Sequence, residues 1–209
     1  MPARTIITAH SGCENTPPNS REFIEKAFDV RCEMLEIDIN RDGDLLYLSH
    51  DKADPSSCVS FEEFLDMLSL HPDVRVNCDM KEEGCCGMVM SAVSRRGMAG
   101  QIVFTGSAHS EEADIRASGG EFWYGLRDGE DLENAVSSCL KTGAKIINLQ
   151  SFVVTDETKR RLDSLGLGFS CWTIDSEDEM RRLLSLGVYN ITTRRPYAVM
   201  RIRDEIQGK

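Results

Sequence analysis

The stretch that decides the fold reads Met34-Leu-Glu-Ile-Asp-Ile-Asn-Arg-Asp-Gly-Asp-Leu-Leu-Tyr-Leu-Ser-His-Asp51. Two runs with alternating apolar residues, 34–39 and 45–49, flank the segment 41–44. Alternation with a period of two is typical of β-strands, and Asp-Gly between two such runs is typical of a tight turn. The stretch therefore predicts a β-hairpin.

Polar side chains gather on one face of this hairpin. Glu36 and Asp38 point to the same side, because alternate side chains of a strand face opposite ways. A hairpin centred on 42–44 would bring His50 opposite Glu36. Carboxylates that lie close together repel each other unless a proton or a cation intervenes, and oxygen ligands suit calcium or magnesium. The alternative is that these residues form only the exposed face of a half-buried hairpin.

Length and composition bound the class of protein. The 209 residues predict a single domain over 1–209, with two domains as the alternative. The net charge of −11 argues against nucleic acid or an anionic membrane as the main partner. The sequence has no integral membrane segment and no secretory hydrophobic region near Met1. Eight cysteines without metal-site spacing suggest reduced thiols, and hence a cytoplasmic protein.

Strand and helix patterns alternate along the chain. Apart from the return strand of the hairpin, the expected strands are 5–9, 34–39, 74–79, 102–105, 121–125, 145–149, 168–174 and 189–193. Each is followed by a helical pattern, which predicts an α/β protein with a parallel sheet. Eight such units predict a (β/α)8 TIM barrel with an extra β-hairpin strand after strand 2. An open doubly wound sheet is the alternative, although no Gly-x-Gly-x-x-Gly follows a strand.

Local signals mark the starts of several helices. Ser60-x-x-Glu63 and Ser176-x-x-Glu179 have the pattern of a capping box, in which each side chain binds a backbone N–H of the other residue. Ser110 is expected to cap a further helix. These positions divide the chain into short strand and helix units joined by short loops.

Polar residues follow the carboxyl ends of the predicted strands, where TIM barrels carry their active sites. They are His10, Glu36, Asp38, Asp79, Lys81, Ser107, His109, Trp172, Thr193 and Arg194. Glu36, Asp38 and Asp79 share the polar phase of their strands with Lys81. This concentration of polar side chains on one rim favours a functional site over a solvated surface.

Short motifs also occur in a fixed order along the chain. They are His10-Ser11-Gly12, Glu14-Asn15-Thr16, Glu36-Ile37-Asp38, His50-Asp51, Asp79-Met80-Lys81, Trp172-Thr173 and Gly187-Val188 with Thr193-Arg194-Arg195-Pro196. This ordered set, from about residue 5 to 196, resembles the glycerophosphodiester phosphodiesterase family. The resemblance implies a TIM-barrel hydrolase of lipid metabolism that cleaves a glycerophosphodiester to an alcohol and glycerol 3-phosphate.

The resemblance also implies roles for individual residues. By position, His10 and His50 correspond to the acid–base pair, and Glu36, Asp38 and Asp79 to ligands of a divalent cation, Ca²⁺ or Mg²⁺. Lys81 corresponds to a phosphate contact, and Trp172 to a wall of the pocket for the alcohol portion. The chemistry agrees, because a phosphodiester anion needs charge neutralisation and two proton transfers. The alternative is a non-catalytic ligand-binding member of the same fold.

Three features depart from the family pattern. Ser11 replaces an arginine, Asp79 replaces a glutamate, and 27 residues separate Asp51 from Asp79 where the family carries a longer inserted cap. Arg194 stands where the family has an aspartate. The last strand of a closed barrel pairs with the first, so we expect Arg194 to lie near Ser11 and to supply the missing phosphate cation.

Overall fold

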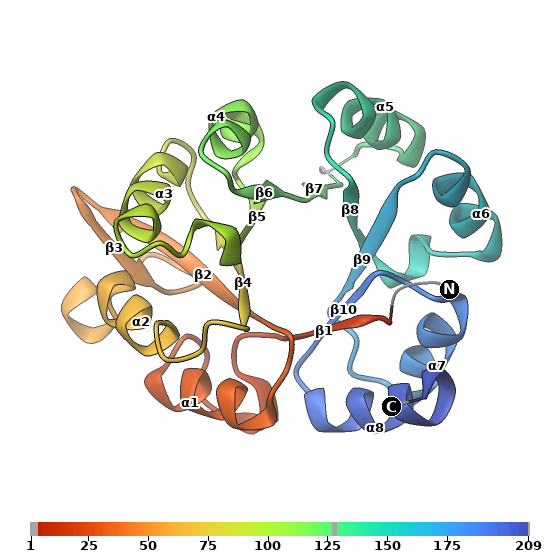
Figure 1. Cartoon of the computed structure of the whole chain (residues 1–209), viewed down its shortest axis with the longest axis horizontal. Helices are drawn as coiled ribbons and strands as arrows, with labels where there is room; N and C mark the ends of the chain where they lie inside the picture. The colour runs from red at the N-terminus through yellow and green to blue at the C-terminus, as the bar shows by residue number, and fades with distance from the viewer. Residues whose placement is uncertain (1–3, 127–128, 209) are drawn as a thin grey trace.

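The computed structural model describes residues 4–126 and 129–208, so residues 1–3, part of the segment expected to lack a secretory region, lie outside it. The strands are β1 (Ile6–Ala9), β2 (Met34–Asp42), β3 (Leu45–Leu48), β4 (Arg75–Met80), β5 (Ile102–Gly106), β6 (Glu121–Phe122), β7 (Tyr124–Gly125), β8 (Ile146–Gln150), β9 (Gly168–Trp172) and β10 (Asn190–Thr193). The helices are α1 (Arg21–Val30), α2 (Phe61–Leu68), α3 (Cys86–Arg95), α4 (Glu112–Ala117), α5 (Leu132–Thr142), α6 (Asp156–Ser164), α7 (Glu177–Leu186) and α8 (Pro196–Gln207). Figure 1 shows the strands as a ring with the helices outside it.

The sheet closes into a barrel. Its order is β6-β5-β4-β2-β1-β10-β9-β8-β7, all parallel, and β3 pairs with β2 in the antiparallel sense. The single strand expected over 121–125 is divided into β6 and β7 by Trp123, which is fully buried and whose backbone N–H donates to Phe104 at 3.0 Å. β6 pairs with β5 and β7 with β8, so this crossing completes the ring. The prediction of a (β/α)8 barrel is confirmed, and the open doubly wound sheet is wrong.

The hairpin has the predicted strands but a different register. Asp42 pairs with Leu45 and Ile39 with Leu48, so the turn contains two residues, with Gly43 at φ 56°. β3 then ends at Leu48. The expectation that His50 pairs opposite Glu36 is therefore wrong, because a two-residue turn moves every partner by one position.

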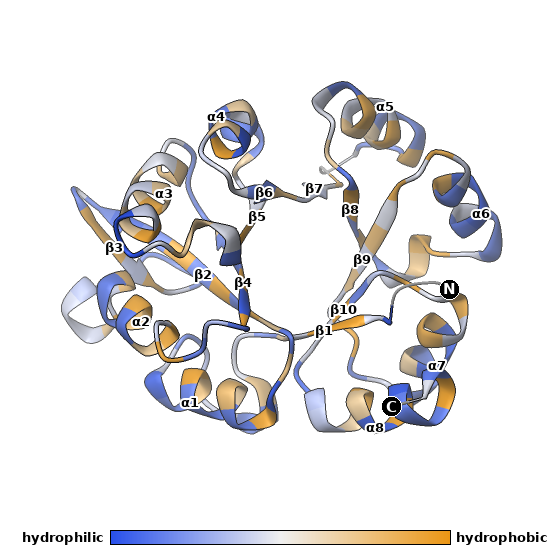
Figure 2. Ribbon diagram, viewed as in Figure 1, coloured by the Kyte–Doolittle hydropathy of each residue, from blue (hydrophilic) through white to orange (hydrophobic). Residues whose placement is uncertain are grey.

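Two apolar clusters support the ring. The larger lies between strands and helices and includes the strand residues Ile37, Ile39, Cys78 and Met80, all 1% exposed or less. A smaller cluster consists of Met34, Val103, Trp123 and Ile146 with Ile6 and Tyr189 against it. Its members on β2, β5 and β8 point to the same side of their strands as the polar residues that follow two positions later. This cluster therefore lies inside the barrel and forms an apolar floor beneath those polar residues. Figure 2 shows hydrophilic and hydrophobic residues interleaved along the surrounding helices, as expected of helices with one face on a sheet.

Only part of the predicted capping is observed. The Ser60 hydroxyl accepts from Glu63 N at 3.1 Å and starts α2 as expected. Ser176 precedes α7 without a side-chain cap, and the Glu179 carboxylate binds Arg182. Ser110 does not cap α4, since a 3₁₀ turn, His109–Glu111, runs directly into that helix. The capping-box prediction at Ser176 and the cap at Ser110 are thus wrong.

Three further observations concern the helices, the segment after the hairpin and the cysteines. No described helix combines the length and the apolar character needed to cross a membrane. The segment between β3 and β4 holds one 3₁₀ turn, Pro55–Ser57, and α2. All eight cysteines are free thiols, and seven of them are buried.

The buried Arg203 attaches the C-terminal helix to the residues that precede β1 and β2, which gives a stability prediction. Arg203 is 2% exposed, and its Nη1 donates to Thr5 O and to Glu33 Oε1, both at 2.7 Å. Arg203→Met leaves both acceptors without this donor, so we expect the free energy of unfolding to fall by about 2 kcal/mol, measured by urea titration. Arg201→Met on the exposed face of α8 is the matched control and should change it little. Equal losses in the two variants would contradict the assignment.

Candidate active site

Three carboxylates meet at the carboxyl ends of β2 and β4. The two strands are neighbours, and their register sets Asp38 beside Asp79 and Glu36 beside Asn77. One oxygen from each of Glu36, Asp38 and Asp79 lies within 4.8 Å of the others. The structure therefore brings together the three residues expected to bind a metal.

Charge is concentrated at this cluster. Burial, followed by the nearby charges of Asp38 and Asp79, raises the pKa of Glu36 well above its usual range. Lys81 Nζ lies 2.7 Å from Asp38 Oδ1 and also contacts Asp79 Oδ2. Burial disfavours the ammonium, but the two aspartates outweigh it and raise the pKa of Lys81. One lysine charge faces three carboxyl groups, so the site retains an excess of negative charge when all are ionised.

Loop residues 10–19 orient two of these carboxylates. Ser11 N donates to Glu36 Oε2 at 2.9 Å, and Asn19 Nδ2 donates to Asp38 Oδ2 at 2.7 Å. Asn19 N in turn donates to the Ser11 hydroxyl at 2.9 Å. Sequence reasoning missed the orienting role of Asn19. Its backbone, at φ 55°, is one that asparagine tolerates better than most residues, but the sequence alone does not reveal that conformation.

Asp79 depends on a glycine. Its Oδ1 lies 3.1 Å from the Thr105 hydroxyl, whose single proton it shares with Asn77 Oδ1. A Cβ built on Gly106 would lie 2.4 Å from the same oxygen and 2.5 Å from Met80 O, and Gly106 has φ 68°. Only glycine fits this position with Asp79 in its present orientation. Residue types alone do not reveal this requirement.

The two histidines lie on the rim in different surroundings. His10 Nδ1 lies 2.8 Å from Ser11 O, and because a carbonyl oxygen only accepts, Nδ1 carries the proton. Burial lowers the pKa of His10. His50 is exposed, with Nδ1 3.0 Å from Asp51 Oδ1. The structure thus brings both histidines to the same mouth although the hairpin does not pair His50 with Glu36.

A cavity of about 400 Å³ joins these groups. Its lining residues are His10, Glu36, Asp38, His50, Asn77, Asp79, Lys81, Thr105, Gly106, Gly125, Leu126, Asn148, Trp172, Thr173, Thr192 and Arg194. Every residue to which a catalytic, metal-binding or substrate-binding role is assigned is among them, whereas the other rim residues, Ser107, His109 and Thr193, are not. Trp172 is 40% exposed at the end of β9, and Arg194 is held by Asp175 at 3.2 Å. Ser11 and Arg194 follow the paired strands β1 and β10, as expected of neighbours on the rim.

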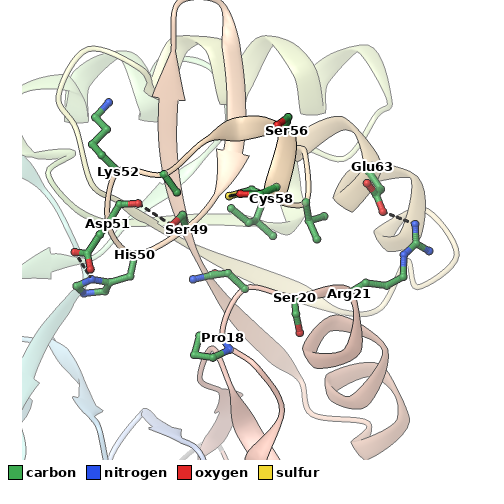
Figure 3. A pocket seen from close by; sticks show the side chains of 15 residues that line it. Pro18, Ser20, Arg21, Ser49, His50, Asp51, Lys52, Ser56, Cys58 and Glu63 are labelled. Atoms are coloured by element: carbon green, nitrogen blue, oxygen red, sulfur yellow. Dashed lines mark hydrogen bonds and ion pairs between the residues drawn. The ribbon is translucent and has the colours of Figure 1, made fainter.

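A second groove, of about 610 Å³, lies outside the barrel mouth between the start of α1 and the segment after β3. Figure 3 shows His50 and Asp51 at one end and the Arg21–Glu63 ion pair at the other. His50 lines both this groove and the barrel cavity. The carboxylate cluster lies only in the barrel cavity, so the chemistry is centred there.

Comparisons with known proteins agree with this arrangement. No family model matches the chain. A glycerophosphodiester phosphodiesterase of Arabidopsis thaliana is 21% identical over 97% of the chain and 74% of its own length. The crystal structure of a glycerophosphodiester phosphodiesterase from Thermotoga maritima matches with a TM-score of 0.80 and 15% identity over 96% of this chain and 99% of that one. An Oleispira antarctica phosphodiesterase, solved with its product sn-glycerol 3-phosphate, matches with a TM-score of 0.79 and 12% identity over 95% and 96%.

The resemblance to the glycerophosphodiester phosphodiesterase family is confirmed. It extends over nearly the whole chain, and the structural matches, at their low identities, establish the shared fold. The predicted class, a phosphoric diester hydrolase similar to these phosphodiesterases, agrees with the same comparisons.

The carboxylate cluster fits a divalent cation of the kind expected for such a phosphodiesterase-like site. All three donors are carboxylate oxygens, which suit a hard cation such as calcium or magnesium. The high pKa of Glu36 indicates that its ionised form lacks a sufficient counter-charge. A cation would provide that counter-charge, so the residues present fit the group.

The glycine beside Asp79 gives a testable consequence. In Gly106→Ala the new methyl group displaces the Asp79 carboxylate, so we expect the affinity for Mg²⁺ or Ca²⁺ to fall by about 10–100-fold, measured by titration calorimetry. Gly87→Ala in α3 is the control, since nothing lies within 4 Å of its Cβ. If the two variants bind the cation equally well, Gly106 does not position Asp79.

Proposed function

We propose that this protein is a metal-dependent phosphodiesterase that hydrolyses a glycerophosphodiester to an alcohol and glycerol 3-phosphate. One observation carries the proposal: a carboxylate cluster, a lysine and two histidines surround a single cavity at the carboxyl ends of the barrel strands. The Arabidopsis, Thermotoga and Oleispira proteins support the choice of substrate class. We also propose that residues 1–209 form one domain acting in the cytoplasm, which the free cysteines support.

Glu36, Asp38 and Asp79 would hold the divalent cation. When bound, the cation supplies Lewis-acid stabilisation of the negative charge on the phosphoryl oxygens. Lys81 is already held against Asp38 and Asp79, so its ammonium group is preorganised to bind a phosphate oxygen. Arg194 lines the same cavity and contributes a second positive charge on the side where Ser11 replaces the family arginine.

His10 is suited to the role of general base. Its Nδ1 proton is committed to Ser11 O, so the neutral ring has its lone pair on Nε2. Burial favours that neutral form. His10 would accept a proton from the attacking hydroxyl group, and the phosphorus–oxygen bond to the leaving alcohol would break as the new one forms.

His50 is suited to the role of general acid. Its ring lies at the mouth, and the Asp51 carboxylate against Nδ1 balances a positive charge on the imidazole. His50 would donate its Nε2 proton to the departing alkoxide. In a glycerol diester, the hydroxyl next to the phosphate attacks first and gives a cyclic phosphate. Water then opens this ring: His50 would accept a proton from the water, and His10 would return its proton to the departing ring oxygen, which yields glycerol 3-phosphate. Trp172 would form the wall beside the organic portion.

Metal dependence is the first test of this function. Release of alcohol from a panel of glycerophosphodiesters should require Ca²⁺, Mg²⁺ or Mn²⁺ and stop in EDTA. Glu36→Gln should lower kcat/KM by about 10²-fold or more, because it removes one ligand charge. Asn134→Leu on the outside of α5 serves as the control. Absence of turnover with every cation and every diester would instead support a non-catalytic binding protein of the same fold.

The pH profile tests the histidine roles. The pKa of His10 is lowered, so the neutral base persists below the ordinary histidine pKa of 6.5, and the acidic limb of kcat/KM should lie under that pH. His50→Gln should lower the rate by about 10²–10⁴-fold, less for a diester whose leaving alcohol is already acidic, such as a nitrophenyl ester. His10→Gln should lower it equally for both esters. Near wild-type rates in both variants would exclude this acid–base pair.

A further inference from the structure

The barrel cavity has two unlike walls. Strands β1, β2 and β4 carry the charged groups, including His10, Glu36 and Lys81. The opposite wall is formed by β7, β8 and β9, and the described residues that line the cavity there carry no charged side chain; they are Gly125, Asn148 and Trp172 with Leu126 and Thr173. A phosphate held by the charged wall would therefore direct its organic portion towards the uncharged one.

Asn148 is the polar group of that uncharged wall. Its strand neighbours Ile147 and Leu149 are fully buried in the outer core, so Asn148 has the opposite phase and faces the barrel interior. It pairs in register with Gly125 on β7 and Ser170 on β9. Its amide thus lies in the same interior layer as the serine hydroxyl, above the apolar floor.

The other polar side chains of this layer satisfy one another. The Thr8 hydroxyl donates to Asn190 Oδ1 at 2.7 Å, and Asn190 Nδ2 donates to Ser170 at 2.9 Å. Across the ring, Thr105 donates to Asn77 Oδ1 at 2.9 Å. Asn148 Oδ1 is buried and has no hydrogen-bond partner within the described part of the chain. A buried amide oxygen without a donor lowers stability. Asn148 lines the cavity with another part of its side chain, so turning the amide about its terminal bond would bring this oxygen to the cavity, where a ligand can supply the donor.

There is room for such a ligand beside Asn148. Among the residues that the structure describes, a Cβ added to Gly125 would find a single atom within 4 Å, His109 Nε2 at 3.9 Å, so these residues leave space next to the amide. Trp172 lies nearer the mouth than Asn148, because it pairs with Gln150, two residues further along β8. A short polyol fits this setting, with its carbon chain along the indole and one hydroxyl at the amide.

We propose that Asn148 is a specificity-determining residue that binds the hydroxyl of the glycerol unit farthest from the phosphate. This inference rests on the proposed function. The amide accepts a hydrogen bond from that hydroxyl and donates one to its oxygen. A site built to bind a hydroxyl discriminates strongly against an analogue without it, because the buried amide is then left unpaired. Asn148 would thereby select glycerol diesters over diesters of simpler alcohols.

The test compares two substrates that differ by this one group. The first is a glycerophosphodiester, and the second is its analogue made from propane-1,2-diol, which keeps the hydroxyl next to the phosphate and lacks the distant one. Wild-type kcat/KM should favour the first by about 10–100-fold. In Asn148→Leu the preference should fall to near one, through loss of the first activity while the second is nearly unchanged. Asn148→Ala is the second variant should leucine not be accommodated.

Matched controls separate this role from a structural one. Asn190→Leu removes a buried amide whose bonds are all internal, so it should lower the melting temperature and leave the substrate ratio unchanged in the folded fraction. Asn148→Leu should keep or raise the melting temperature, since it removes an unsatisfied group. An unchanged ratio in Asn148→Leu, or an equal loss on both substrates, overturns the inference.

Failure of the function is distinguishable from failure of the inference. If the wild-type protein cleaves no diester, the proposed function is wrong, and calorimetry then compares sn-glycerol 3-phosphate with propane-1,2-diol 1-phosphate as ligands. Tighter binding of the first by wild type, lost in Asn148→Leu, still supports a hydroxyl site at Asn148. Equal affinities, or no binding of either compound, reject it.

Discussion

Mutual repulsion among Glu36, Asp38 and Asp79 is the constraint on which the rest of the site depends. Adjacent parallel strands force these side chains onto one face, and the burial of Glu36 and Asp38 limits the water that could separate the charges. The surrounding structure stabilises the cluster with hydrogen-bond donors from the first loop and with the lysine that follows β4, and a glycine leaves room for Asp79. The same excess of negative charge that is costly to the free protein makes the cavity receptive to a cation. The apolar floor beneath it keeps the cluster at the mouth.

Much of the fold could be predicted from the sequence because its signals are periodic. Alternating runs gave the strands, and eight of them with intervening helices indicated a closed barrel. The same phase argument grouped Glu36, Asp38 and Asp79 correctly, since it depends only on neighbouring strands running in parallel. Ordered short motifs added His10 and Lys81 to the group, and all of them line one cavity.

The remaining features depend on geometry that residue types do not specify. The hairpin register differs by one position because Asp-Gly is compatible with turns of more than one length, and this removed His50 from its expected pairing. Ser176 has the capping sequence, yet its side chain does not cap α7, and the Glu179 carboxylate binds Arg182. Gly106 is required by its close approach to Asp79 and Met80 on the neighbouring strand, and the role proposed for Asn148 rests on an oxygen without a partner; nothing in their local sequence marks either residue.

The position of β1 in the ring has a consequence for biosynthesis. This strand lies between β2 and β10, and Thr8 bonds to a residue 182 positions further along. While the chain emerges from the ribosome, β1 can complete only one of its two hydrogen-bonded edges, and the barrel persists as an open sheet until its last strand is released. Exposed strand edges invite pairing with other nascent chains. The net charge of −11 opposes such encounters, so the acidity of this protein protects it most during the interval before closure.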